Sequence, residues 1–221
     1  MRTIAVIGRK GGCGKTTIAV HLAIGLHLRG RATVLADTDP QRSAIDVFKG
    51  RKEPGLGVVV SSAAKLFTLQ LTMARAQHEA LVIDTPAVLE EDIAQAVVLA
   101  DLALLVVRPT FLDLAAAART SEIIRRLRKP GLVVLNQAPV ARGSVEAPQV
   151  ARAIEALRLL QLPVAPTVIR ARASYQSVVE TGRSVEELNG EPLSAVEMRA
   201  FCDFVHRFAF APRKGGIIAR A

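Results

Sequence analysis

Short apolar runs alternate along this chain with longer stretches in which apolar positions recur every three or four residues. Near-continuous apolar runs are typical of parallel strands covered on both faces, and strands separated by helical stretches indicate repeated strand–helix–strand units. The pattern therefore predicts an α/β fold, with a mostly parallel, twisted sheet flanked by helices on both faces. The predicted strands are Thr3–Ile7, Ala32–Ala36, Ala80–Ile83, Leu102–Val107, Gly131–Leu135 and Val164–Val168.

Three predicted helices can be placed from their spacing and end signals. The first spans Lys15–Arg29 and is followed by Gly30, which suits the turn after a helix. A second spans Leu112–Arg128, and the last is predicted to begin at a capping box of Ser194 and Glu197. The apolar positions that mark the buried faces are Ala19, Leu22, Ala23 and Leu26 in the first helix, and Phe201, Phe204, Val205 and Phe208 in the last.

Length and composition predict a single domain over residues 1–221, with no helix-turn-helix domain before the first strand. The basic tail at 212–221 is expected to fray. Half of the residues are apolar, yet no apolar run reaches the roughly 18 residues that a transmembrane helix needs. Two distant cysteines, Cys13 and Cys202, form no disulfide framework, and the first apolar run is too short before Arg9 to predict a secretory signal. These features favour a cytoplasmic protein.

A glycine-rich loop joins the first strand to the first helix. Gly8 to Thr16 fits the pattern G-x-x-x-x-G-K-[ST], in which an apolar strand leads into a loop that cradles phosphates. The N–H groups of such a loop and the positive end of the following helix form an anion site. Lys15 would reach the terminal phosphates, and the Thr16 hydroxyl would take one coordination position of Mg²⁺. The loop predicts a nucleotide-binding site.

The loop holds a second lysine, Lys10, which a simple phosphate loop does not need. The run Lys-Gly-Gly-x-Gly-Lys-Thr-Thr at 10–17 resembles the deviant Walker A motif of the ParA/MinD family of partition and positioning ATPases, in particular its short plasmid-type members. In that family the first lysine reaches across a dimer interface to the ATP of the other subunit. The resemblance implies that Lys10 acts in trans, as an arginine finger does, alongside Lys15. The residues expected to contact ATP are Lys10, Gly11, Gly12, Cys13, Gly14, Lys15, Thr16, Thr17 and Asn136.

Carboxylates follow two of the predicted strands. Asp37-Thr38-Asp39-Pro40-Gln41 ends one strand and looks like the family's D-x-D-P-Q segment, which implies that Asp39 orients the attacking water and that Asp37 lies near the metal. Asp84 ends another strand at a position like that of Walker B, where a carboxylate holds a Mg²⁺-bound water. Thr16, Asp37 and Asp84 are therefore the expected metal-site residues. The acidic triplet at 90–92 fits the first turn of a helix better than catalysis.

For two further residues, Asn136 and Cys13, the sequence leaves two roles open. Asn136 follows the predicted strand Gly131–Leu135, and relatives in the ParA/MinD family place an asparagine near here to contact adenine; a loop-forming role is equally open. Cys13 lies at the variable position of the loop, where a small residue is tolerated. A redox role for its thiol is the alternative.

Positive charge is concentrated in the middle of the chain. The formal net charge is +9, and residues 108–172 carry 11 Lys and Arg against 4 Asp and Glu. Such an excess is typical of a protein that binds a polyanion, although a solvated basic face would look the same. Arg170 and Arg172 lie in a stretch whose basic residues contact DNA in relatives, and Arg125 and Arg126 form a second basic cluster.

The leading hypothesis is a Mg²⁺-dependent, ParA-like ATPase that forms an ATP-sandwich homodimer and binds DNA non-specifically, in the nucleoid when ATP is bound. A ParB-like or cargo-adaptor protein would stimulate hydrolysis and release. The cargo, a plasmid, a chromosome region or a protein assembly, stays open. A MinD-like protein bound to membranes through a C-terminal helix is one alternative, disfavoured by Pro212 and two glycines in the last ten residues. A metabolic phosphate-loop enzyme is another.

Overall fold

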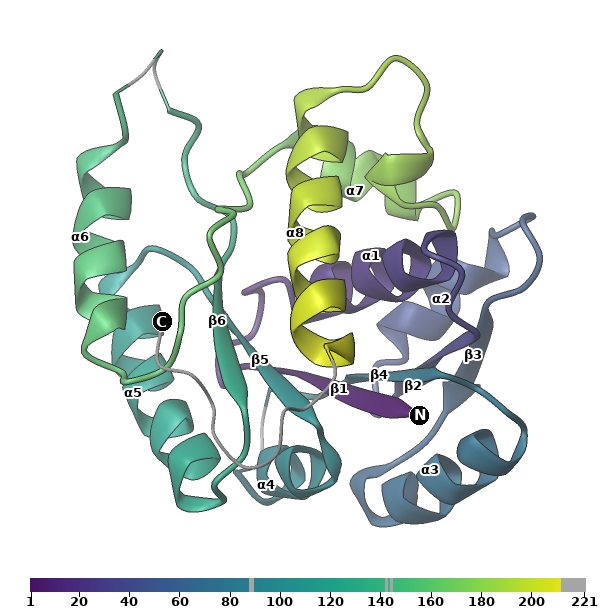
Figure 1. Cartoon of the computed structure of the whole chain (residues 1–221). Helices are drawn as coiled ribbons and strands as arrows, with labels where there is room; N and C mark the ends of the chain where they lie inside the picture. The colour runs from purple at the N-terminus through teal and green to yellow at the C-terminus, as the bar shows by residue number, and fades with distance from the viewer. Residues whose placement is uncertain (88–89, 142, 144, 212–221) are drawn as a thin grey trace.

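The computed structural model describes residues 1–87, 90–141, 143 and 145–211, so the predicted frayed tail at 212–221 lies outside the described residues. The described strands form one six-stranded sheet in the order β3-β2-β4-β1-β5-β6, in which every neighbouring pair is parallel (Figure 1). The strands are β1 (Arg2–Ile7), β2 (Thr33–Asp37), β3 (Gly57–Val60), β4 (Ala80–Asp84), β5 (Leu102–Val107) and β6 (Gly131–Leu135). The predicted parallel α/β fold is confirmed.

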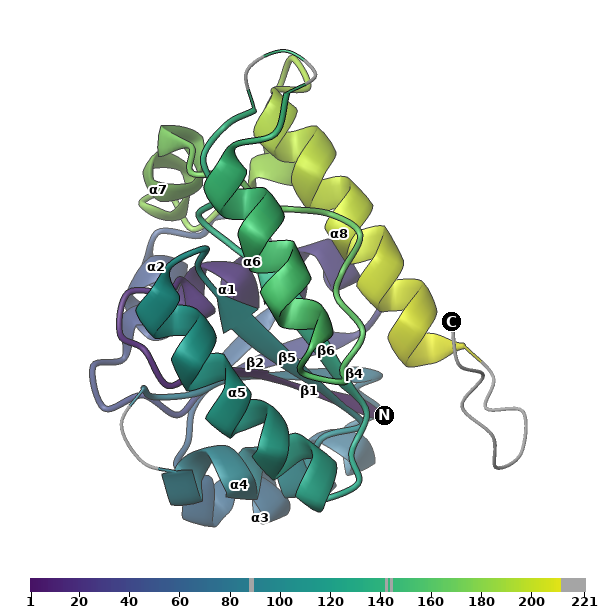
Figure 2. The ribbon, with the colours of Figure 1, turned by 90° about the vertical axis from the view of Figure 1, so that its left-hand side faces the viewer.

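Helices cover both faces of the sheet and bury two separate apolar layers (Figures 1 and 2). One layer lies under α1 (Lys15–Leu28), α2 (Ser43–Lys49), α7 (Ala173–Val179), η2 (Val185–Glu187) and α8 (Leu193–Phe210). The other lies under α3 (Leu66–Arg75), α4 (Glu90–Leu99), α5 (Phe111–Arg126) and α6 (Pro148–Arg158), and η1 (Ala63–Lys65) leads into α3. Strands β2, β4, β5 and β6 are buried at every position, which explains why they are continuous apolar runs in the sequence.

The two edges of the sheet differ from the sequence prediction. The edge strand β3 was not predicted, because two of its four residues are half-buried, the other two are exposed, and the apolar pattern is short. The run Val164–Val168, predicted as a strand, follows β6 but forms only the isolated bridge Val133↔Val164 in this region. Main-chain hydrogen bonds link Ala165 N–H to Val133 O and Ile169 N–H to Leu135 O, and no described bond to β6 lies between them, so no continuous ladder forms.

The predicted capping box at the start of α8 is also wrong. Helix α8 begins at Leu193, one residue after Pro192, and no side chain caps its first turn. Glu197 instead accepts hydrogen bonds from Arg172 and Tyr175, and the hydroxyl of Ser194 bonds that of Ser174. A charge-assisted contact with another segment therefore replaces the local cap. The capping box of the described chain lies at Ser184 and Glu187, at the start of η2.

Among the described helices, none is long and apolar enough to cross a membrane. Helix α1 is the most buried of them, and both sides of it pack against apolar side chains. This position makes α1 a rigid support for the loop that precedes it.

A buried histidine in α1 makes stability depend on pH. His21 is fully buried, and burial lowers its pKa from 6.5 to about 4, while Nε2 finds no partner among the described residues. The unfolded chain binds a proton below about pH 6.5 and the folded chain does not, so protonation favours unfolding. Glutamine does not titrate. As the pH falls from 6 to 4, we therefore expect the free energy of unfolding of His21→Gln to rise relative to that of the wild type by about 1.4 kcal/mol per pH unit. Urea unfolding of both proteins across this range measures the difference, and a constant difference would contradict the assignment.

Candidate functional site

The glycine-rich loop lies between the carboxyl end of β1 and the start of α1, in the middle of the sheet. Gly14 is the residue before α1 and has φ 91°, and Gly12 has φ 71°, so both occupy the left-handed region that favours glycine. Among the described residues, no hydrogen bond uses the N–H groups of Gly11, Gly12 or Gly14. These N–H groups and the first turn of α1 together form a cradle for an anion.

Two amide side chains that follow β6 hold this loop in shape. Asn136 Nδ2 donates to the carbonyl oxygen of Cys13 at 2.8 Å, and Gln137 Nε2 donates to that of Gly12 at 2.9 Å. A Cβ atom on Gly14 would lie 2.2 Å from Asn136 Nδ2, so only glycine permits this approach. With Asn136 4% exposed, the structure places it against the loop; contact with a nucleotide base stays a prediction. Sequence reasoning did not single out Gln137.

The two lysines of the loop differ in their surroundings. Lys15 is 7% exposed, and its Nζ lies 3.4 Å from the main-chain oxygen of Lys10, which anchors the ammonium group beside the loop. The side chain of Lys10 is half-buried, and no described hydrogen bond or ion pair uses its Nζ. The fold therefore uses Lys10 through its backbone and leaves its ammonium group available for another role.

The Asp84 carboxylate lies at the end of β4, next to β1 and β2. It is 1% exposed, and neither of its oxygens has a hydrogen-bond partner among the described residues. Burial raises its pKa to about 7, because the charged form loses its hydration. An unpaired, buried carboxylate is costly to the fold, and a bound cation would satisfy it.

The aspartates Asp37 and Asp39 lie beside Asp84 at the same edge of the sheet. Asp37 pairs in register with Asp84 across β2 and β4, so both side chains point to one face. Its oxygens accept hydrogen bonds from the N–H groups of Asp39 and Ile45, both at 3.1 Å, while burial raises its pKa. Asp39 is half-buried, and its Oδ1 accepts the N–H group of Gln41 at 2.9 Å. The structure thus brings the three predicted carboxylates together.

The donor set at this edge fits Mg²⁺. Mg²⁺ prefers oxygen ligands and is usually held by one or two carboxylates, waters and substrate phosphates. The unpaired oxygens of Asp84 provide such a carboxylate, and the hydroxyl of Thr16 lies near them in the first turn of α1. Among the described residues, no group of three His, Cys, Asp or Glu side chains could hold a metal alone. The fit is therefore to an ion whose coordination a nucleotide would complete.

The structure also locates the predicted DNA-contacting arginines. Arg170 is held by Glu146, at 2.8 and 2.7 Å, and Arg172 by Glu197, at 3.1 Å through Nε. Both are partly buried in these ion pairs, which tie the segment after β6 to its neighbours. Arg125 and Arg126, near the end of α5, are exposed, and Arg125 bonds Gln161.

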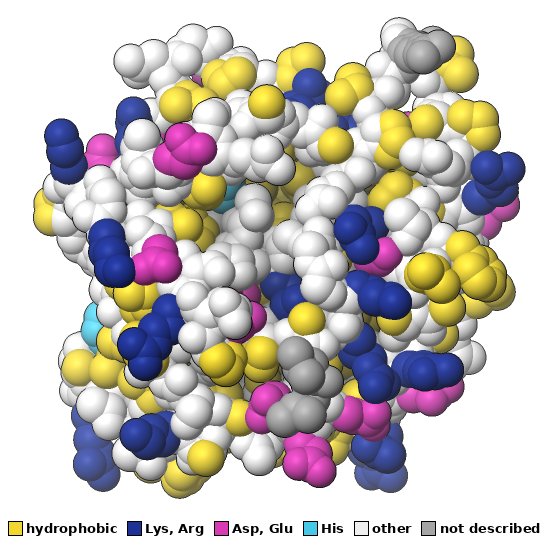
Figure 3. Space-filling view, turned by 180° about the vertical axis from the view of Figure 1, so that it is seen from behind, with side chains coloured by type: hydrophobic (Ala, Val, Ile, Leu, Met, Phe, Trp, Pro, Cys, Tyr) yellow, Lys and Arg dark blue, Asp and Glu magenta, His cyan; other side chains and the backbone are white. Residues whose placement is uncertain are grey.

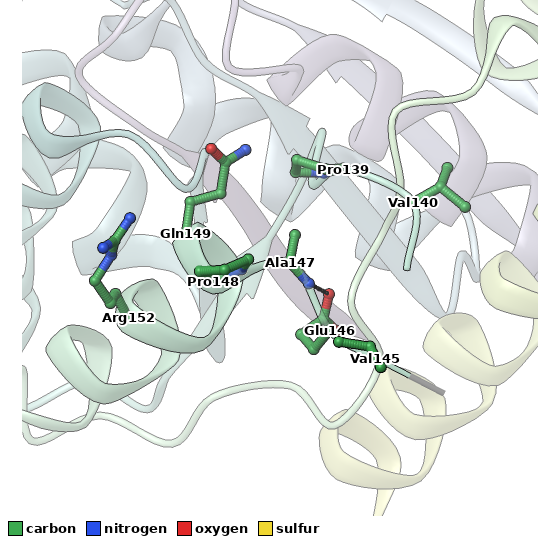
Figure 4. Close-up of a pocket in the computed structure, with 8 residues that line it drawn as sticks. All are labelled: Pro139, Val140, Val145, Glu146, Ala147, Pro148, Gln149 and Arg152. Atoms are coloured by element: carbon green, nitrogen blue, oxygen red, sulfur yellow. Dashed lines mark hydrogen bonds between the residues drawn. The ribbon is translucent and has the colours of Figure 1, made fainter. Parts of the chain in front are cut away.

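A cavity of about 550 Å³ lies beside Glu146, between the loop after β6 and the first turns of α6 (Figure 4). Its walls include Pro139 on one side and Gln149 and Arg152 on the other. None of the side chains that line it comes from residues 8–17, so it is separate from the cradle of the glycine-rich loop.

Cys13 is 1% exposed, and burial raises the pKa of its thiol. The thiolate is the reactive form of cysteine, so this environment makes Cys13 an unreactive side chain that packs under the loop.

The site geometry agrees with a match along most of the chain. A family model described as the CobQ/CobB/MinD/ParA nucleotide-binding domain matches residues 4–185. The chain belongs to this family. It is a ParA/MinD-type ATPase.

Two similar proteins match most of the length of this chain. The maintenance of carboxysome distribution protein A of Halothiobacillus neapolitanus is 36% identical over 203 residues, which span 88% of this chain and 91% of that protein. Its namesake from Gloeobacter kilaueensis is 30% identical and covers 86% of each chain. The solved structure of a Cyanothece McdA variant in complex with ATP has a TM-score of 0.78 and 18% identity, with 94% of this chain and 95% of that chain covered. That likeness concerns the fold.

Proposed function

We propose that ATP joins two copies of this ParA-like positioning ATPase into a dimer, that the dimer binds DNA non-specifically, and that a partner protein stimulates hydrolysis to release it. The observation that carries the proposal is the arrangement at one edge of the sheet: a phosphate loop with a spare lysine, next to a buried carboxylate without a partner. Mg²⁺ held by Asp84 and Thr16 would supply charge stabilisation at the phosphates when bound.

The surroundings of Lys10 support the dimer. No described residue binds the Lys10 ammonium group, so it does not stabilise the fold of one subunit. The triphosphate bound by the partner subunit would provide the negative counter-charge for this group. Asp39 lies close enough in sequence and space to Asp37 and Asp84 to orient a water in the same site. In this proposal each subunit contributes the loop and the carboxylates to its own ATP, and Lys10 to its partner's ATP.

The face formed by α5 and α6 is the proposed DNA surface. Its exposed cations are Arg119, Arg125, Arg126, Arg128, Arg152 and Arg158. The two helices lie side by side (Figure 2). In the view from behind, Lys and Arg side chains are spread over both halves of the molecule, with Asp and Glu side chains among them (Figure 3). Arg119 and Arg126 also line a cleft of about 450 Å³ with Arg9 of the loop, which brings the basic face next to the nucleotide site. Arg170 and Arg172, being ion-paired, contribute less in this arrangement.

Removing two charges from this face tests the DNA surface. We expect the double variant Arg125→Ala, Arg126→Ala to weaken ATP-dependent binding to non-specific duplex DNA, and to lower the slope of log affinity against log salt by about 2, because each phosphate contact contributes about 0.9. Fluorescence anisotropy across a salt series measures both. The matched control, Lys65→Ala with Arg75→Ala, removes two exposed cations from the region of α3. Equal losses in both variants would contradict a local DNA surface, and binding to anionic vesicles in place of DNA would favour the membrane-bound alternative.

We propose a protein assembly as the cargo, in place of a plasmid or a chromosome region. The support is that two relatives matched over 88% and 86% of this chain are maintenance of carboxysome distribution proteins, whereas the match to Protein ParA of Rhizobium radiobacter covers 56% of this chain at 28% identity. The stimulating partner would then be an adaptor on that assembly.

A further inference from the structure

The residue that follows β5, Arg108, projects beside the phosphate loop. Strand β5 pairs with β1 in parallel, so its carboxyl end reaches the same edge of the sheet as the glycine-rich loop. A Cβ atom on Gly12 would lie 3.8 Å from Arg108 Nη1, which places the guanidinium group against the loop. Its side chain is 31% exposed, so this face of the loop is open to a ligand.

A buried carboxylate fixes the direction of this guanidinium group. Asp113, in the first turn of α5, accepts Arg108 Nε on Oδ1 at 3.0 Å and Nη2 on Oδ2 at 3.1 Å. The hydroxyl of Thr110 donates to the same Oδ2 at 2.6 Å. Burial disfavours the charged form of Asp113, but these hydrogen bonds outweigh it, and the pKa of Asp113 is lowered. The carboxylate is thus charged, and both of its oxygens accept hydrogen bonds from the arginine.

This arrangement occupies two of the three guanidinium nitrogens and leaves the third. No described hydrogen bond uses Nη1, which is the nitrogen nearest Gly12. A guanidinium group held in a fixed plane loses little side-chain entropy when it binds an oxyanion. Lys10 and Asp113 also line one small void between the loop and α5, so Arg108 lies in the region of the loop that carries the spare lysine.

We propose that Arg108 is a third cation of the phosphate site, whose Nη1 donates to a phosphate oxygen of the nucleotide held by the loop. Asp113 and Thr110 act as positioning residues that aim it. The inference rests on the family's nucleotide site and deepens the proposed function, because it gives the loop a cation from the segment after β5 in addition to Lys15. Phosphate is the chemical class that this geometry recognises, since a charge-assisted hydrogen bond from a fixed arginine favours an oxyanion over a neutral ligand.

Equilibrium binding of fluorescent ADP and of a non-hydrolysable ATP analogue, both with Mg²⁺, tests this assignment. We expect Arg108→Gln to weaken the binding of at least one of them by ~10- to 100-fold, the range that a hydrogen bond to a charged group supports. Arg108→Lys should lose most of the same affinity, because one ammonium group cannot both pair with Asp113 and reach the loop. It also keeps a charge beside Asp113, which protects the fold if the glutamine variant fails to fold. Arg31→Gln is the matched control, since Arg31 is also 31% exposed and paired with a carboxylate, but lies just before β2 at the opposite edge of the sheet.

Affinity within about twofold of the wild type for both ligands in a folded Arg108 variant would overturn the proposal. An equal loss in Arg31→Gln would also overturn it, because the effect would then follow net charge. Failure of the proposed function is a different result: the wild type would bind nucleotide, Arg108→Gln would bind it weakly, and neither dimer nor DNA complex would form with ATP.

Discussion

Asp84→Asn is expected to reduce Mg²⁺-dependent ATP turnover by ~1,000-fold, because a metal ion supplies several kcal/mol of charge stabilisation at the transferring phosphate. The same substitution should stabilise the protein without ligands. The carboxylate is buried with both oxygens unpaired, and the amide that replaces it carries no charge to desolvate. Activity and stability therefore move in opposite directions, which is expected where a fold is strained to hold a functional group.

The stabilisation should depend on pH in a defined direction. Burial raises the pKa of Asp84 to about 7 in the folded chain, from an ordinary value near 4 in the unfolded chain. Between these values the unfolded chain releases its proton and the folded chain keeps it, so the wild type loses stability as pH rises. We expect the advantage of the variant to grow by up to about 4 kcal/mol between pH 4 and pH 8. Denaturant unfolding in EDTA without nucleotide measures it.

Asp37→Asn is the matched control for this experiment. Asp37 is equally buried and pairs in register with Asp84, but its oxygens accept two main-chain N–H groups. Its replacement removes good acceptors and should lower stability. Stabilisation by both variants would show that burial alone matters, and destabilisation by Asp84→Asn would contradict an unpaired carboxylate.

The centre of the fold and the composition of the site could be predicted because they depend on local signals. A strand buried on both faces must be apolar throughout, and the phosphate loop needs glycine at fixed positions such as Gly14. The carboxylates follow from the same logic, since parallel strands end at one edge and bring Asp37 and Asp84 into register. Topology thus converts residues far apart in sequence into one cluster.

What the sequence did not reveal depends on contacts between distant segments. In the sequence Gln137 looks like an ordinary loop residue, and Arg108 like one of many arginines. Their contacts with the glycine-rich loop become visible only when the fold places the ends of β6 and β5 beside that loop. The ion pairs of Arg170 and Arg172 were hidden for the same reason, because positive charge in a sequence says nothing of the carboxylate that pairs with it. The sequence shows where charged residues stand, and the fold determines which of them are free of an ion pair and so available to bind a ligand.

Lys10→Ala is expected to abolish ATP-dependent dimerisation and to reduce partner-stimulated hydrolysis by ~1,000-fold or more, the scale of a charge supplied in trans. Nucleotide binding by one subunit should change little. The reason lies in how the loop uses this residue: Lys15 is anchored by the main-chain oxygen of Lys10, which alanine retains, and the Lys10 ammonium group binds no described residue. The substitution therefore removes a side chain without disturbing the cradle. Light scattering with a non-hydrolysable ATP analogue measures the dimer, and fluorescent ADP measures the site.

The neighbouring cation supplies a sharp control for Lys10. Arg9 lies in the same loop and is 30% exposed, but its guanidinium group pairs with Glu90 at 3.1 Å and so points toward α4. Arg9→Ala removes the same charge one residue away and should leave dimerisation near that of the wild type. Loss of the dimer in both variants would mean that the loop needs positive charge of any kind, and a normal dimer in Lys10→Ala would remove the role in trans. If the dimer is lost in Lys10→Ala but kept in Arg9→Ala, the loop is half of a nucleotide site that two subunits complete.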